Sequence, residues 1–136
     1  MAYTRTDWVS GETPLSADNM NNIEDGIEEL NSNTVLIDST NQTYNVSVYA
    51  YKVGNVVTVT VFRESGSKPS SKGWTTIDVL PEGSRPPVDL LAYFYSGGTT
   101  KDTTVRMRID TAGVIALYGI PQDAQLGGTI TFAATQ

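Results

Sequence analysis

The sequence predicts a mainly β protein, in which one short N-terminal helix precedes an antiparallel β-sandwich or barrel of about seven strands. Apolar residues recur with a helical period only within residues 14–30. From Thr43 onward they alternate with polar residues in short runs that are separated by turn signals. No segment shows the strand–helix–strand spacing of a parallel sheet. We therefore divide the 136 residues into an N-terminal segment, 1–40, and a β domain, 41–136.

The start of the helix is marked by capping residues. Ser16 is a good N-cap, and Asp18 places a negative charge in the first turn, where the helix dipole is positive. Leu15 and Met20 have the spacing of a hydrophobic staple. These residues predict a helix that begins just after Ser16.

The helix carries a narrow apolar seam, formed by Met20, Ile23, Ile27 and Leu30 at spacings of three, four and three. A helix of about 15 residues is marginal alone, so the seam requires a partner surface. That partner is either the β domain of the same chain or the same helix in other subunits, and the narrowness of the seam favours the second. The heptad phase continues through Thr34 and Ile37, although residues 31–33 are weak helix formers. These residues leave the number of copies open.

The expected strands are short and follow one another closely. Gly54 and Asn55 predict a two-residue hairpin, the prolines of residues 81–87 predict a rigid corner, and Gly97 and Gly98 are expected to end a strand. Residues 121–128 are expected to form a loop. Residues 88–95 are nearly all apolar, which indicates a strand covered on both faces or lying at a subunit interface. The predicted strands are residues 44–50, 56–62, 74–80, 88–95, 105–109, 114–118 and 129–134.

Composition excludes several chemistries. The chain has no cysteine and no histidine, which rules out disulfides, Cys/His zinc sites and His-dependent catalytic triads. Residues 1–40 hold eight acids against one base, and residues 41–136 hold seven acids against eight bases. The acidic first third argues against nucleic-acid binding. No run has the length of a signal-peptide core or a membrane span, so we expect neither secretion nor membrane insertion.

The N-terminal segment resembles a known family. The run Trp8-Val9-Ser10-Gly11-Glu12-Thr13-Pro14-Leu15, followed by Asn19, Asn22-Ile23-Glu24 and Gly26-Ile27, is similar to the start of tail and baseplate proteins of phages that infect Gram-positive bacteria. In that family the segment leads into a trimeric helical stem. The resemblance therefore implies a trimeric coiled coil. For Trp8 two roles remain open, packing on its own helix or a neighbouring subunit, and docking onto another virion protein.

The β domain resembles the C-terminal head of phage receptor-binding and tail-fibre proteins. The resemblance rests on Leu80-Pro81-Glu82-Gly83-Ser84-Arg85-Pro86 after Trp74, and on Ile109-Asp110-Thr111-Ala112-Gly113-Val114-Ile115. Ser84 stands where that corner more usually has an aromatic residue. The resemblance implies a head that binds saccharide on the bacterial surface.

Because the chain has no histidine and no cysteine, we expect any catalysis to rest on a pair of carboxylates, as in glycosidases. The candidates are Asp78, Glu82, Asp89 and Asp110, and none lies in a recognisable motif. The acidic residues of the helix lack the ligand pattern of a calcium loop. We therefore expect no enzymatic activity, no cofactor and no metal site.

Exposed aromatic rings and arginines are the candidate binding groups. Aromatic rings suit the faces of sugars, and arginine binds phosphate or hydroxyl groups in a fork. Arg106 and Arg108 share one strand face with Asp110, so this group either bridges subunits or holds a phosphate-bearing wall sugar. Core packing or a subunit interface is the alternative role for the aromatic residues and the two arginines. The candidate saccharide-binding residues are Trp74, Tyr93, Tyr95, Arg106, Arg108, Asp110 and Tyr118.

Together these inferences predict a homotrimeric receptor-binding protein of a phage virion, located at the tail tip or baseplate and made in the host cytoplasm. Its expected partners are two further copies, other tail or baseplate proteins at the N-terminus, and host cell-wall saccharide. The alternative is a structural baseplate or tail connector that binds no saccharide.

Overall fold

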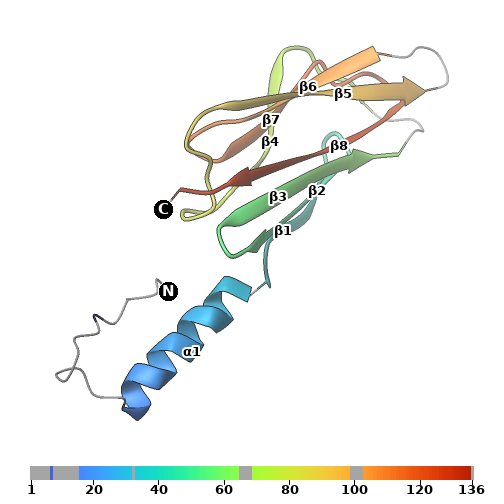
Figure 1. The fold of residues 1–136 in the computed structure, drawn as a ribbon. Coiled ribbons are helices and arrows are strands. Elements are labelled where there is room, and N and C mark those ends of the chain that lie inside the picture. Colours follow the sequence, from blue (N-terminus) through green and yellow to red (C-terminus); the bar gives the residue numbers. More distant parts are fainter. Residues whose placement is uncertain (1–6, 8–15, 32, 65–68, 99–102, 136) are drawn as a thin grey trace.

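The computed structural model describes residues 7, 16–31, 33–64, 69–98 and 103–135, which form one helix and eight strands. Figure 1 shows the helix extending away from the strands. The elements are α1 (Ala17–Asn31), β1 (Asn33–Asn41), β2 (Val46–Val53), β3 (Val56–Arg63), β4 (Trp74–Val79), β5 (Leu90–Gly98), β6 (Thr103–Ile109), β7 (Val114–Tyr118) and β8 (Ala124–Ala133).

Helix α1 begins where the capping residues predict. The side-chain oxygen of Ser16 accepts a hydrogen bond from the backbone N–H of Asn19 at 3.2 Å, so Ser16 is the N-cap. Met20 and Ile27 are 45% and 52% exposed, and Ile23 is half-buried. The helix therefore presents apolar side chains to solvent.

The eight strands form one antiparallel sheet in the order β1-β2-β3-β8-β5-β6-β7-β4. The sheet curls until its two edge strands approach each other, and the hydroxyl of Ser39 on β1 donates a 2.6 Å hydrogen bond to Asp78 Oδ2 on β4. The expected mainly β fold with an antiparallel barrel-like sheet is thus confirmed. We call the end of the barrel where β3, β5 and β7 finish the distal end, because it lies opposite α1 (Figure 1).

One face of every strand lines a single hydrophobic core. Alternation is clearest in β2, β3 and β6, where every second residue is buried. The largest fully buried apolar side chains include Leu80, Met107, Ile109, Ile115, Leu117, Ile120 and Leu126. The opposite face of the same strands points outward and carries the candidate binding residues.

Strand β1 was not expected from the sequence. The sequence predicts that the heptad phase continues through Thr34 and Ile37 within the segment 1–40, yet residues 33–41 pair with β2. Ile37, interpreted as a continuation of the heptad seam, is buried in the barrel core. A bulge between Val35 and Ile37 interrupts the alternation, and the β-branched run Thr34-Val35 favours a strand over a helix. The expected count of about seven strands becomes eight.

Several expected boundaries were also wrong. Strand β2 begins at Val46 because Asn45 has a positive φ of 54° and belongs to the preceding turn. Strand β5 continues through Gly97 and ends at Gly98, since these glycines pair with Gln125 and Ala124 of β8. Strand β8 starts at Ala124, within the expected loop 121–128. Strand β5 starts at Leu90, and its outer face, which includes Leu91, Tyr93 and Tyr95, is exposed in the single chain, so a subunit interface at this face stays a prediction.

A hydrogen-bonded arginine closes the distal end of the core. Arg63 is 1% exposed, and its guanidinium donates hydrogen bonds to the carbonyls of Tyr44, Pro69, Pro121 and Ala124. Burial lowers the pKa of Arg63, and the nearby carboxylate of Asp123 partly opposes that shift. Arg63 thus ties together four segments at the end where the binding candidates lie.

Candidate functional site

Four of the predicted site residues form one row across the outer face of the barrel. The strand registers pair Tyr93 on β5 with Arg106 on β6, Arg106 with Tyr118 on β7, and Tyr118 with Trp74 on β4. Directly paired side chains on one face of a sheet lie about 5 Å apart. The sequence could not show this row, because its four members lie on four different strands.

The row is held together by ring and cation contacts. The rings of Trp74 and Tyr118 meet edge-on, with centroids 5.2 Å apart. The guanidinium carbon of Arg106 lies 3.8 Å from the Tyr118 ring centroid and 5.6 Å from that of Trp74. These contacts orient Arg106 without using its hydrogen-bond donors.

Arg108 joins the row from the same strand face. Its guanidinium carbon lies 4.4 Å from the Trp74 ring centroid, and its paired neighbour Ala116 is buried beneath the outer side chains. The Nε atom of Arg108 is buried and has no hydrogen-bond partner among the described residues. A buried donor without a partner is rare in folded proteins and requires an explanation. We call Trp74, Tyr93, Arg106, Arg108 and Tyr118 the arginine–aromatic patch.

No carboxylate of the described chain forms an ion pair with Arg106 or Arg108. The nearby acids are engaged elsewhere. Asp110 Oδ1 accepts backbone hydrogen bonds from Ala112 at 3.0 Å and Val114 at 2.9 Å, and so stabilises the turn between β6 and β7. Asp89 similarly accepts a hydrogen bond from the backbone N–H of Thr111. The two guanidiniums of the patch therefore present positive charge that these acids do not neutralise, and Asp110 has a structural role in the turn.

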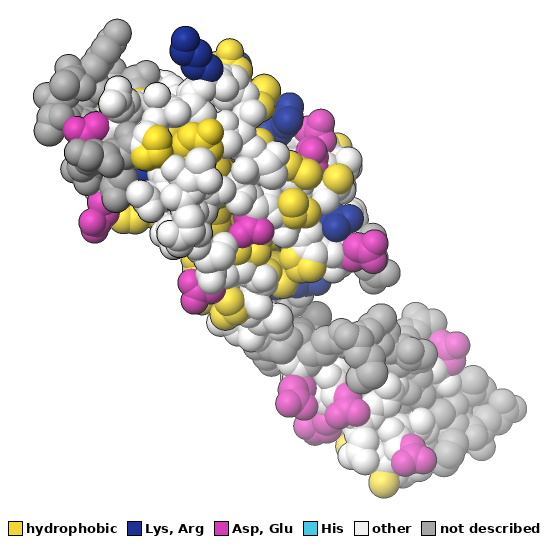
Figure 2. All heavy atoms as spheres, turned by 180° about the vertical axis from the view of Figure 1, so that it is seen from behind, with side chains coloured by type: hydrophobic (Ala, Val, Ile, Leu, Met, Phe, Trp, Pro, Cys, Tyr) yellow, Lys and Arg dark blue, Asp and Glu magenta, His cyan; other side chains and the backbone are white. Residues whose placement is uncertain are grey.

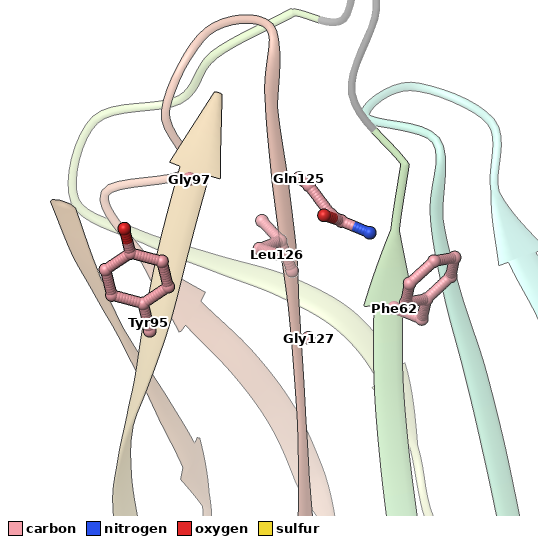
Figure 3. A pocket seen from close by; sticks show the side chains of 6 residues that line it. All are labelled: Phe62, Tyr95, Gly97, Gln125, Leu126 and Gly127. Carbon is pink, nitrogen blue, oxygen red and sulfur yellow. The ribbon is translucent and has the colours of Figure 1, made fainter. Parts of the chain in front are cut away.

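Tyr95 lies on the same strand as Tyr93 but borders a different feature. It lines an open hollow of about 370 Å³, together with Phe62, Gly97, Gln125, Leu126 and Gly127. Figure 3 shows the Tyr95 ring on one side of β8, the Phe62 ring on the other, and Gln125 between them. The seven predicted residues thus divide into the patch, the hollow and the turn formed by Asp110.

The hollow contains residues that sequence reasoning did not select. Phe62 was interpreted only as part of a strand, and Gln125 and Gly127 as part of a loop. The sequence could have indicated Phe62, because alternation along the strand places it on the same face as the polar residues Thr58 and Thr60. In the structure this face points outward and Phe62 is 42% exposed. The signal for Gln125 was missing because β8 was expected to start at residue 129.

The other predicted residues are only partly described. Met20, Ile23 and Ile27 lie on α1 as expected, and Leu30 is within the helix but its side chain is outside the described residues. Trp8 also lies outside them. Of the other carboxylates considered for catalysis, Asp78 is hydrogen-bonded to Ser39 and to the backbone N–H of Val79. In the ranges that the structure describes, no cluster of acids could hold a metal ion.

Surface colouring shows how charge is distributed between the helix and the barrel. In Figure 2, the charged side chains on the helical part of the molecule are acidic, whereas the barrel carries acidic, basic and apolar side chains interspersed. Among the described helices, none is long and apolar enough to cross a bilayer. The two parts of the chain thus differ in charge, with eight acids against one base in residues 1–40 and seven acids against eight bases in residues 41–136.

Comparison with known proteins identifies the fold. The structure is similar to the head domain of lactococcal phage bIL170, described as a receptor-binding domain, with a TM-score of 0.52 and 11% sequence identity. The similarity covers 76% of this chain and 98% of that head domain. No protein-family model matches the sequence, and no curated protein matches it. The β part of the chain thus has the fold of a phage head domain.

Proposed function

We propose that this protein is the receptor-binding protein of a phage that infects Gram-positive bacteria, and that its barrel attaches the virion to cell-surface saccharide. The fold of the bIL170 head supports this proposal. The observation that carries it is the arginine–aromatic patch, in which four strands bring exposed rings and two unneutralised guanidiniums onto one outer face. No catalytic step and no cofactor are part of the proposal.

The patch suits a saccharide that carries a negative group. Tyr93 is 64% exposed and Trp74 is 38% exposed, so both rings are accessible to the apolar face of a sugar. Arg106 and Arg108 retain donors for a phosphate or carboxylate, and the desolvated Nε of Arg108 would gain a partner on binding. A phosphate-bearing wall polymer satisfies both requirements.

Binding to purified cell-wall polysaccharide tests the proposal. The full chain is titrated with polysaccharides from a panel of Gram-positive bacteria, and the variants Trp74→Ala and Arg106→Gln are compared with the wild type. We expect saturable binding that each variant weakens at least ten-fold. Tyr49→Ala is a matched control, because Tyr49 is also exposed but lies on β2. Absence of binding to any wall polysaccharide contradicts the proposal.

The alternative function is a structural connector in the tail or baseplate. It is favoured by an exposed apolar residue next to the patch, since Leu91, which pairs with Arg108, is 51% exposed. A connector would bind another virion protein through this surface and would show no saccharide-dependent signal. The same titration separates the two functions.

We further propose that α1 assembles the protein into a trimer at the virion. The exposed Met20 and Ile27 side chains support an association between helices, and the N-terminal segment with Trp8 would contact other tail proteins. Ile27→Asn should convert the trimer to a monomer in light scattering while leaving the barrel folded. A matched control is Glu28→Gln, which changes an exposed residue outside the seam.

A further inference from the structure

The hollow beside Tyr95 has the features of a ligand-binding site, and it is separate from the arginine–aromatic patch. Phe62 on β3 pairs with Gly127 on β8, and the pairing of Ser96 with Leu126 places Tyr95 beside Gly127 on the other side. Two aromatic rings therefore flank one glycine across three adjacent strands (Figure 3). Phe62 and Tyr95 are 42% and 69% exposed, so both rings are open to solvent.

Gly127 allows the Phe62 ring to lie close to the backbone of β8. A Cβ atom on Gly127 would lie 3.2 Å from the carbonyl oxygen of Val61 and 3.3 Å from Cδ2 of Phe62. Gly97 also lacks a side chain, so two of the residues that line the hollow present only backbone. Gln125 supplies the one side-chain amide among the lining residues, which can both donate and accept hydrogen bonds.

These groups fit an uncharged sugar ring. The C–H faces of a pyranose pack against aromatic rings, and its hydroxyl groups bind amides and backbone polar groups. The residues that line the hollow carry no formal charge, in contrast to the patch with its two guanidiniums. The two sites therefore differ in the chemistry they accept.

The hollow and the patch are joined by β5. Tyr93 belongs to the patch and Tyr95 to the hollow, and both side chains point outward from the same strand, two residues apart. Strands lie about 4.8 Å apart and rise about 3.3 Å per residue, so the path from Trp74 through Tyr93 and Tyr95 to Phe62 is on the order of 25–30 Å long. A single sugar ring covers only a small part of that path.

We infer that the hollow is a second subsite, and that the ligand is an oligosaccharide long enough to reach both sites. Its negatively charged group would lie on Arg106 and Arg108, and an uncharged ring would lie between Phe62 and Tyr95. This inference rests on the proposed receptor-binding function. Charge complementarity favours this occupant, because the negative group of an anionic glycan neutralises the two guanidiniums of the patch.

Fragments of different length test the inference. A wall polysaccharide that binds the wild type is partially hydrolysed, and its size-fractionated oligosaccharides are titrated calorimetrically into the full chain. We expect affinity to rise at least ten-fold between the shortest charged fragment and fragments that can reach the hollow. Phe62→Ser should abolish this rise and leave the affinity for the shortest charged fragment unchanged.

Matched variants distinguish the two subsites. Val56→Ser removes an exposed apolar side chain elsewhere on the outer face of β3 and should preserve the length dependence. Arg106→Gln should weaken the binding of charged fragments of every length. Circular dichroism confirms that each variant is folded, and light scattering measures its mass.

Three results would overturn the inference. One is an affinity that does not depend on length, which leaves receptor binding intact but removes the second subsite. Another is an unchanged rise with Phe62→Ser. The third is a change of oligomeric mass with Phe62→Ser, which would make the hollow an interface between copies. If the wild type binds no wall polysaccharide, the proposed function fails together with the inference.

Discussion

Arginine and aromatic residues lie on both the inner and the outer face of the barrel, but they have different roles on each face. On the inner face, Arg63 is buried and its guanidinium donates to four backbone carbonyls. On the outer face, Arg106 and Arg108 contact aromatic rings and form no hydrogen bond or ion pair with described residues. An arginine that stabilises the fold therefore has its donors satisfied by the protein, whereas arginines that are available to a ligand do not.

Aromatic residues show the same contrast along β5. Phe94 is 6% exposed and points into the core, whereas its neighbours Tyr93 and Tyr95 are exposed on the opposite face. Alternation along a strand forces this division, since successive side chains point to opposite sides of a sheet. Substitutions on the inner face should therefore affect stability, and substitutions on the outer face should affect binding.

The largest expected effect comes from Phe94→Ala. Removing a buried phenyl ring leaves a cavity and loses apolar burial, which costs about 3–5 kcal/mol of unfolding free energy. Tyr93→Ala, on the outer face of the same strand, should cost less than about 1 kcal/mol. Urea denaturation followed by tryptophan fluorescence measures both. Equal losses for the two variants would contradict the division between the faces.

Arg63→Met should have the next largest effect. The substitution keeps much of the apolar stem but leaves buried carbonyls without their donor, which costs on the order of 3 kcal/mol. Urea denaturation measures the loss, and Arg63→Lys, which retains one cationic group, should recover part of it. If Arg63→Met is as stable as the wild type, the four hydrogen bonds do not hold the distal end together.

Gly128→Ala tests the packing between β8 and β5. A Cβ atom at this position would lie 2.1 Å from Cδ1 of Phe94, so the phenyl ring must move. Overpacking of this kind costs about 1–3 kcal/mol. The double variant Gly128→Ala/Phe94→Leu should be less destabilised than the sum of its single variants, because the smaller side chain relieves the clash. Additive losses in urea denaturation would show that Phe94 is not the residue that requires glycine here.

The contrast between the faces also explains what the sequence could predict. Period-two alternation predicted the strands β2, β3 and β6, and the shared strand face of Arg106 and Arg108 followed from the same pattern. Strand β1 was missed because a bulge breaks its alternation, and the start of β8 was missed because Gly127 and Gly128 resemble a loop. The start of β8 is set by pairing with β3 and β5, which are distant in sequence and override local preference, whereas β1 pairs with the next strand along the chain.

The candidate site could be predicted only as a set of residue types. The sequence selected exposed aromatic residues and arginines, but the row from Tyr93 to Trp74 depends on the order β5-β6-β7-β4. That order places β4, the fourth strand of the chain, beside β7, so Trp74 meets Tyr118 across more than forty residues of sequence. No local pattern contains this information. The role of Asp110 in its turn was likewise hidden, because it depends on the backbone conformation after β6.

Arg108→Met should have the smallest effect on the free energy of unfolding. The sign of that effect shows whether the contact with Trp74 or the unpaired Nε atom contributes more. The variant loses the contact with Trp74, which is worth about 0.5–2 kcal/mol, but it also removes a desolvated Nε that has no partner, whose burial costs about 1–3 kcal/mol. The two terms nearly cancel, so the unfolding free energy should change by less than about 1 kcal/mol. Binding of charged wall polysaccharide should nevertheless fall at least ten-fold and lose part of its salt dependence. A loss of stability as large as that of Arg63→Met would place Arg108 among the residues that hold the fold, and would leave Arg106 as the cation on which the binding surface depends.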